Sequence, residues 1–400
     1  MKLFAPILLF LSSLSAEIYD VSIPENDTAS YNYADFRMWV NDSTDTLRGI
    51  YWFMHPNNGD SRNIVTDSTY QALVSEQDFA LMGAHIFNMH MNTGIGDAVI
   101  AAMDSFAVLF RHDELEFIPF FVNGYSWGGQ FGYHFTKWIP ERVVGFITQK
   151  GGYHDTTDAG DAIEVPGLMF IGENDLPYRI ENLTGIFLEH RPLGAKWILA
   201  MEQGTGHTQV TDYSFLNSFF NTITNLRLPD SVDVFQPIQL NTLPDTLGWV
   251  GDQNSWIIGS FDCYDGLIDS SSWFPSNNVG ERWQYFVSEG EVNDTSECDG
   301  SVGIDIRIHV PTDFLLYHPY PNPFNPSTTL RFNIPSNTTK PVLINIYDIA
   351  GSVVKTVINE RIESGYHEIQ WNLTASSSGV YFVELRIGEK RLVQKLLFLK

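Results

Sequence analysis

The chain has 400 residues, of which 44% are hydrophobic, and its formal net charge is −25. This length usually supports two or more domains, and the apolar content excludes a disordered chain. Residues 311–400 carry 9 Lys+Arg and 7 Asp+Glu, a net charge of +2, which leaves −27 on residues 1–310. Such a negative charge repels phosphate groups and argues against a nucleic-acid partner.

The N-terminus has the pattern of a secretory signal peptide. Residues 3–11 are apolar, and small residues near Ala16 offer a cleavage site, so residues 1–16 are predicted to be removed on export. No later run of about 18 apolar residues occurs, and we expect no transmembrane segment. Cys263 and Cys298 could form one disulfide in an oxidising compartment, but their spacing does not decide this.

From about residue 47, short apolar runs alternate with longer helix-like segments. Asp97 is a predicted N-cap for a helix over residues 98–110, and residues 130–138 and 212–223 are also predicted helices. Near-continuous apolar strands between helices indicate an α/β domain with a doubly wound, mostly parallel sheet, over about residues 20–226. The predicted strands are residues 49–54, 79–87, 117–122, 143–147, 167–171 and 197–200.

Two further regions follow the α/β domain. Residues 227–310 are rich in Asp and Trp and have few periodic runs, so we expect an irregular extension that packs on the α/β domain. Its tryptophans are Trp249, Trp256, Trp273 and Trp283. Residues 317–400 contain short alternating strands separated by turn residues, which predicts a small β-sandwich domain.

The most informative motif is Gly124-Tyr125-Ser126-Trp127-Gly128-Gly129. It follows an apolar strand and precedes a helix-like segment, which is the context of a nucleophile elbow. Glycines are needed there because the turn is tight and two chain segments approach closely. The motif therefore predicts that Ser126 is a catalytic nucleophile.

A serine nucleophile needs a base, and the base needs an acid to orient it. Asp175 lies directly after the strand over residues 167–171, at the carboxyl end of the sheet, and is the predicted acid. Glu173 and Asp161 are alternatives that fit a strand-end loop less well.

The predicted base is His207, in a glycine-containing loop after the strand over residues 197–200. The order Ser, Asp, His along the chain is the one that this kind of fold uses. His154 precedes the acid and His190 lies in a helix-like stretch, so neither fits as well.

The tetrahedral oxyanion of such a reaction needs hydrogen-bond donors already in place. We expect one donor to be the backbone N–H of Trp127 and the other that of Asn57, with Asn58 as an alternative. The sequence has no metal-ligand spacing and no dinucleotide or phosphate motif, so no metal and no cofactor are predicted.

Ser126, Asp175 and His207 in this order resemble the α/β-hydrolase superfamily, over about residues 45–226. The Gly-x-Ser-x-Gly-Gly form is similar to that of secreted esterases, including polyhydroxybutyrate depolymerase-like and feruloyl esterase-like enzymes. The resemblance implies ester hydrolysis through an acyl-serine intermediate. Such esterases often carry His-Gly in the oxyanion loop, where this chain has His55-Pro56.

A second resemblance covers residues 317–400. The segment Tyr320-Pro321-Asn322-Pro323-Phe324-Asn325-Pro326, together with residues 342–351, 379–381 and 395–400, resembles a type IX secretion (Por) C-terminal sorting domain. The resemblance implies an immunoglobulin-like sandwich. It also implies recognition by the type IX secretion machinery and export through the periplasm and across the outer membrane.

The sequence thus predicts a secreted or cell-surface serine hydrolase that cleaves carboxylic esters, with a small-molecule or polymer ester as substrate. Two alternatives remain open. One is a serine peptidase of the prolyl-oligopeptidase-like type, and the other is a non-catalytic surface protein that binds glycans on a hydrolase scaffold.

Overall fold

The computed structural model describes residues 17–25, 29–56, 59–229, 233, 235–264, 266–293, 295–296, 314–316, 319, 324–335, 340–362, 365–373, 378–388 and 390–400. The predicted signal peptide therefore lies outside the described residues. The chain divides into two compact units, Met1–Asp299 and Gly300–Lys400.

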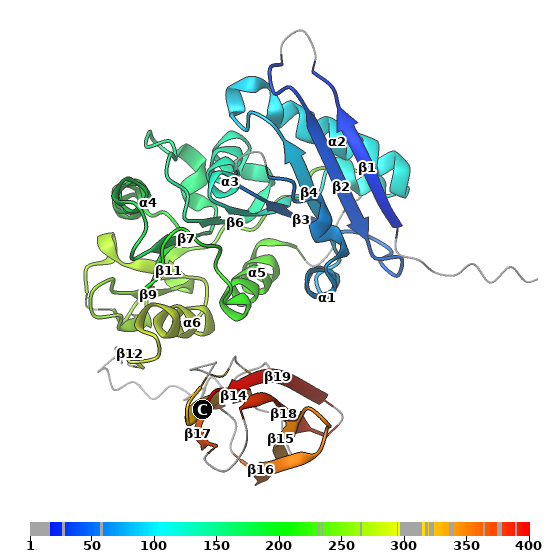
Figure 1. Ribbon diagram of the computed structural model, residues 1–400. Helices are drawn as coiled ribbons and strands as arrows, with labels where there is room; N and C mark the ends of the chain where they lie inside the picture. The colour runs from blue at the N-terminus through cyan, green and yellow to red at the C-terminus, as the bar shows by residue number, and fades with distance from the viewer. Residues whose placement is uncertain are drawn as a thin grey trace, which may run out of the picture. The chain divides into compact units, whose positions relative to one another are not determined.

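The first unit is built on an eight-stranded sheet with the order β1-β2-β4-β3-β5-β6-β7-β8 (Figure 1). Strand β2 pairs antiparallel with β1 and β4, and all other neighbouring pairs are parallel. This is the strand arrangement of an α/β-hydrolase, and it confirms the predicted fold class. The strands are β1 (Glu17–Ile23), β2 (Ala34–Val40), β3 (Gly49–Met54), β4 (Phe79–Ile86), β5 (Phe120–Tyr125), β6 (Val143–Gln149), β7 (Gly167–Gly172) and β8 (Trp197–Glu202).

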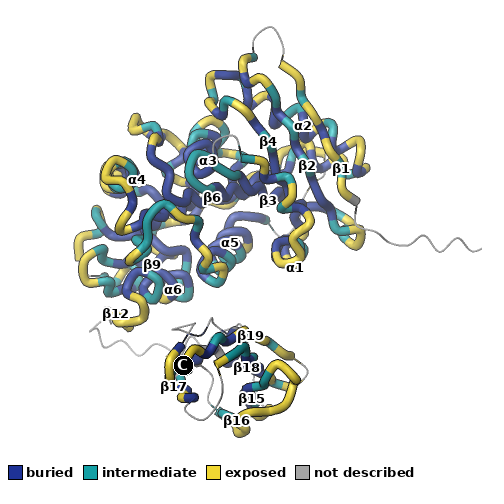
Figure 2. Tube along the Cα trace, viewed as in Figure 1, coloured by how far each residue is buried: buried dark blue, intermediate teal, exposed yellow. Residues whose placement is uncertain are grey.

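Helices cover both faces of this sheet, and its central strands are buried along their length, except at Tyr125, the last residue of β5 (Figure 2). Successive side chains of β3 point to opposite faces. Trp52 packs against Phe131 of α3, whereas Tyr51 packs against Phe220 of α5. The helices are α1 (Ser68–Ser75), α2 (Ile95–Phe110), α3 (Trp127–Trp138), α4 (Pro177–His190), α5 (Tyr213–Arg227) and α6 (Asn277–Ser288).

Two helix starts differ from the prediction. Asp97 is not the N-cap of α2: Gly94 is, and Asp97 lies in the first turn, where its charge suits the positive end of the helix dipole. Helix α2 starts early because Gly94 adopts a left-handed conformation (φ 81°) that glycine tolerates. Helix α3 begins at Trp127, immediately after Ser126, rather than at residue 130.

The segment after α5 covers the edge of the sheet at β8. The Trp283 Nε1–H donates to the Leu199 carbonyl oxygen (2.7 Å), and the Leu199 N–H donates to Ser272 Oγ (2.9 Å). These contacts satisfy backbone groups that an edge strand would otherwise expose. Trp273 and Trp283 are fully buried, so neither ring can bind a glycan at the surface. The small sheet of this segment has the order β11 (Ser272–Phe274), β9 (Trp249–Gly251), β10 (Ile258–Ser260) and β12 (Thr295–Ser296).

The second unit has two antiparallel sheets that enclose a core of apolar side chains, among them Phe332, Ile344 and Val383. This arrangement confirms the predicted β-sandwich. One sheet has the order β13 (Leu315–Leu316), β14 (Ser327–Ile334) and β17 (Gly365–Asn372). The other has the order β16 (Val353–Glu360), β15 (Val342–Asp348), β18 (Gly379–Ile387) and β19 (Lys390–Phe398).

Candidate active site

Ser126 lies in the sharp turn between β5 and α3. Its backbone has φ 55° and ψ −119°, a strained conformation for a residue with a side chain. The turn depends on glycine: a Cβ atom at Gly124 would lie 2.3 Å from the Gly128 backbone, and one at Gly128 would lie 2.5 Å from the His55 carbonyl oxygen. The motif therefore folds as the predicted strand–turn–helix elbow.

The structure brings the three predicted polar residues together at the carboxyl edge of the sheet. Asp175 follows β7, and His207 follows the neighbouring strand β8. His207 Nε2 lies 2.8 Å from Ser126 Oγ, and His207 Nδ1 lies 2.9 Å from Asp175 Oδ2. A hydroxyl, an imidazole and a carboxylate thus form one hydrogen-bonded row.

Asp175 is held as a carboxylate. Its side chain is buried, and its second oxygen, Oδ1, accepts hydrogen bonds from Arg179 Nη1 (2.9 Å) and the Leu176 N–H (2.7 Å). Burial alone would raise the pKa of Asp175, but the hydrogen bonds from His207, Arg179 and Leu176 hold it below 3.8. An ionised Asp175 accepts the Nδ1 proton of His207, which leaves Nε2 able to accept the proton of Ser126.

Lys150 anchors the loop that carries His207, and sequence reasoning missed it. Its ammonium group is fully buried, forms an ion pair with Glu202, and donates to the hydroxyls of Thr205 (3.0 Å) and Thr208 (3.2 Å). These threonines stand on either side of His207. The position of Lys150 directly after the apolar strand β6 could have marked it as a residue near the site, but the sequence alone does not reveal its partners.

Tyr125, the residue before Ser126, also holds the loop that carries His207. Its hydroxyl donates to the carbonyl oxygen of His207 at 2.7 Å. Burial and the nearby charge of Asp175 raise the pKa of Tyr125 above 10, so the phenol keeps its proton at neutral pH and remains a donor. The imidazole of His207 is therefore positioned through its own main chain as well as through Asp175.

The other candidate acids and bases have different surroundings. Glu173 accepts a hydrogen bond from the Gly204 N–H (2.7 Å) and so supports the loop of His207. His154 is buried against Thr148 Oγ1 (2.8 Å), and His190 is buried against the Ile186 carbonyl oxygen (2.8 Å). Asp161 lies in the 3-10 helix η5 (Gly160–Glu164).

The two predicted oxyanion donors stand differently. Trp127 is the first residue of α3. The first N–H groups of a helix have no partner within the helix, so the Trp127 N–H, directly after Ser126, can donate to a ligand. Asn57 and its alternative Asn58 lie outside the described residues.

No group of His, Cys, Asp and Glu side chains within the described ranges is arranged to hold a metal ion. Cys263 is disulfide-bonded, and Cys298 lies outside the described residues. Of the helices that the structure describes, none is both long and apolar enough to cross a membrane.

Comparison with known proteins identifies the C-terminal region. Residues 318–399 match the family model described as the secretion system C-terminal sorting domain. The second unit is such a sorting domain. Its presence indicates that the chain is exported by a secretion system. No curated protein matches the sequence.

Solved structures share the α/β fold of the first unit at low identity. An S-formylglutathione hydrolase from Agrobacterium tumefaciens is 13% identical, and the match covers 54% of this chain and 96% of that one, with a TM-score of 0.40. A poly(3-hydroxybutyrate) depolymerase from Bordetella parapertussis is 11% identical, with 55% and 93% covered and a TM-score of 0.40. A feruloyl esterase module from Clostridium thermocellum is 11% identical, with 49% and 83% covered and a TM-score of 0.34.

Proposed function

We propose that the protein is an exported serine hydrolase that cleaves carboxylic esters through an acyl-serine intermediate. The observation that carries this proposal is His207, which bridges the Ser126 hydroxyl and the Asp175 carboxylate at 2.8 and 2.9 Å. A serine is a weak nucleophile until an adjacent base removes its proton, and this row supplies such a base together with its orienting acid.

In the proposed reaction, Ser126 Oγ attacks the ester carbonyl carbon while its proton passes to His207 Nε2. The resulting imidazolium is stabilised by Asp175, which stays ionised throughout. The Trp127 N–H donates to the oxyanion of the tetrahedral intermediate. His207 then gives its proton to the departing alcohol. In the second half of the reaction, water attacks the acyl carbon while His207 takes its proton, which releases the acid and frees Ser126.

The sorting domain supports a location outside the cytoplasm. We propose that the chain crosses the periplasm and the outer membrane through the type IX machinery and acts at the cell surface or in the medium. Its substrates would then be extracellular polymer fragments or the ester groups that decorate them.

Turnover of p-nitrophenyl esters by the wild type and by Ser126→Ala tests the proposal. We expect Ser126→Ala to lower kcat by about 10⁴-fold or more, with an unchanged circular dichroism spectrum. Turnover that does not depend on Ser126 would refute the proposal. A parallel assay with peptide substrates separates an esterase from a serine peptidase.

A further inference from the structure

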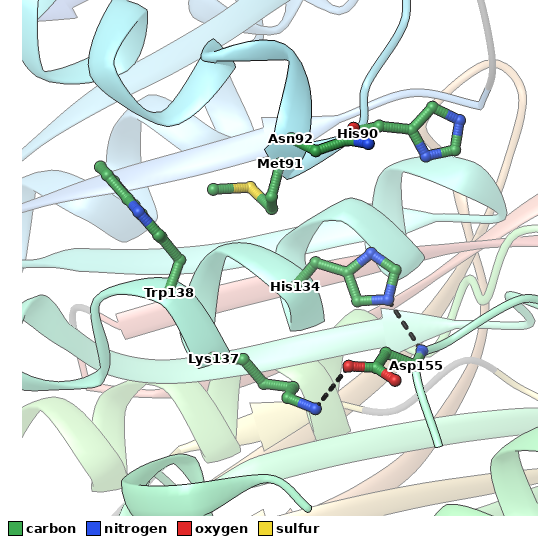
Figure 3. Close-up of a pocket in the computed structure, with 7 residues that line it drawn as sticks. All are labelled: His90, Met91, Asn92, His134, Lys137, Trp138 and Asp155. Carbon is green, nitrogen blue, oxygen red and sulfur yellow. Dashed lines mark hydrogen bonds and ion pairs between the residues drawn. The ribbon is translucent and has the colours of Figure 1, made fainter. Parts of the chain in front are cut away.

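A pocket of about 530 Å³ lies along α3, the helix that begins directly after Ser126 (Figure 3). One wall is the segment that follows β4, with His90, Met91 and Asn92, and the other is the C-terminal part of α3. Asp155, which follows β6, closes one end. None of these residues has a role in the reaction proposed above.

The pocket is joined to the reaction centre through Trp127. The His90 ring packs edge-on against the Trp127 ring, with centroids 5.5 Å apart, and Trp127 is bonded directly to Ser126. His90 and Asp155 both follow strands of the parallel part of the sheet, at the carboxyl edge where open α/β sheets bind their ligands. The His90 end of the pocket is therefore the end nearer to Ser126.

At this nearer end, His134 is a neutral hydrogen-bonding group. The Asp155 N–H donates to His134 Nε2 at 2.8 Å, and burial lowers the pKa of His134 to about 4. At neutral pH the ring is uncharged and carries its proton on Nδ1, which in Figure 3 points toward the side of His90 and Asn92. His134 therefore presents an N–H donor to the pocket.

The opposite end is apolar. Met91 and Trp138 lie there, away from the imidazoles of His90 and His134 (Figure 3). The Trp138 side chain is 42% exposed, so part of the indole ring can be covered by a ligand. Covering such a ring removes apolar surface from water, which favours an apolar group at this end.

The pocket has no cation free to bind an anion. Lys137 donates to Asp155 Oδ2 (2.7 Å) and to the hydroxyl and carbonyl oxygens of Thr157 (3.1 Å each), which uses its three protons. The net charge of residues 1–310 also opposes the approach of anions. The Asp155 carboxylate is likewise paired, because it accepts from Lys137 and from the N–H (3.0 Å) and hydroxyl (2.7 Å) of Thr157. With both charges already partnered, the pocket favours an uncharged ligand.

We propose that this pocket is a substrate subsite for an uncharged group that places a hydrogen-bond acceptor beside His90 and His134 and an apolar end against Met91 and Trp138. The inference rests on the proposed ester hydrolysis and names its substrate class: neutral esters whose apolar end lies about eight bonds or more from the scissile carbonyl. That reach is needed because α3 rises about 1.5 Å per residue and Trp138 is its last residue. Short esters and esters with an anionic end gain nothing from the pocket.

Trp138→Ala tests the subsite in the full chain with three methyl esters: 8-phenyloctanoate, acetate and the monoanionic suberate half-ester. We expect kcat/KM for the phenyloctanoate to fall about tenfold with the indole removed. Acetate turnover should stay within twofold, and the suberate half-ester should be the poorer long substrate for both proteins. The matched control is Phe235→Ala, which removes another exposed aromatic ring and should leave all three rates unchanged.

Equal losses for acetate and phenyloctanoate, the same loss in Phe235→Ala, or a preference for the suberate half-ester would overturn the subsite. If the wild type hydrolyses none of the esters, the proposed function fails, and calorimetric titration with methyl 8-phenyloctanoate decides the pocket separately. Binding to the wild type that Trp138→Ala weakens would then retain a neutral-ligand site, whereas no binding to the wild type would remove it.

Discussion

The ammonium group of Lys150 lies 3.0 Å from the hydroxyl oxygen of Thr205, two residues before His207. It also reaches Thr208, one residue after His207, so a single buried cation holds the loop on both sides of the imidazole. Because a displacement of about 1 Å in a reacting group can cost 10²-fold in rate, this contact bears on activity as well as on stability.

Removing both hydroxyls tests this anchoring. Thr205→Val with Thr208→Val keeps the side-chain shapes and the ion pair of Lys150 with Glu202, but it removes the two acceptors. We expect kcat for a p-nitrophenyl ester to fall about 10- to 100-fold, with little change in KM. The control is Thr205→Ser with Thr208→Ser, which keeps the hydroxyls. If the valine pair is as active as the serine pair, Lys150 does not position His207.

Arg179→Gln removes one of the two side chains that hold the Asp175 carboxylate. We expect the free energy of unfolding at pH 7 to fall by about 1–2 kcal/mol, because a largely buried, charge-assisted hydrogen bond is lost. Since the folded pKa of Asp175 is lowered, its stabilising contribution is complete above the unfolded pKa of about 3.9 and is lost as the pH falls through the folded pKa.

The stability difference between the wild type and Arg179→Gln should therefore be largest near neutral pH and shrink below about pH 4. Urea unfolding followed by tryptophan fluorescence at a series of pH values measures it. Arg111→Gln, at an exposed position, is the control and should show little difference at any pH. A difference that grows on acidification would contradict the assigned role of Arg179.

Two Gly→Ala substitutions should have opposite effects. At Gly128 the new methyl group would meet the backbone carbonyls of Met54 and His55, so we expect ester turnover and thermal stability both to fall. At Gly185, an exposed position inside α4, a Cβ atom meets nothing within 4 Å. There we expect a gain of about 0.5–1 kcal/mol in helix stability. Thermal melts of both variants test this pair, and a harmless Gly128→Ala would contradict the tight elbow.

The positions of Ser126, Asp175 and His207 could be predicted because each follows an apolar strand. In a parallel sheet all such strands end at the same edge, so strand-end residues far apart in the sequence converge. The glycines of the elbow added a local signal with a steric cause. The first two strands of the eight-stranded sheet could not be predicted in the same way. β1 and β2 form an amphipathic antiparallel pair, and they precede residue 47, where the alternation of apolar strands and helices begins.

Lys150 and Arg179 could not be assigned from the sequence for a different reason. The partner of Lys150, Thr205, lies on another loop 55 residues away. Arg179 is only one helical turn from Asp175, but it has other polar neighbours in its sequence and nothing there singles out this contact. Which of many polar side chains a buried cation meets is decided by how the loops pack. The tryptophans of the extension were more informative: they suggested a segment that packs on the α/β domain, and Trp273 and Trp283 lie in one core cluster with Ile198 of β8.

A chain that ends at residue 299 should keep ester hydrolysis. Ser126, Asp175, His207 and Lys150 all belong to the first compact unit, and the sorting domain contributes none of these groups. We expect kcat/KM within about twofold of the full chain, while export from the producing cell is lost. The truncated Ser126→Ala protein serves as the inactive control, and a folded but inactive truncated chain would show that the site needs the sorting domain.

Fluorophosphonate labelling with mass spectrometry of the digested protein tests the central proposal most directly, because this reagent modifies a serine only when a base activates it. We expect one adduct per chain, on Ser126, formed in step with the loss of ester turnover, and slowed strongly in His207→Ala. An unlabelled Ser126, or an adduct on another residue that accounts for the lost turnover, would contradict the proposal.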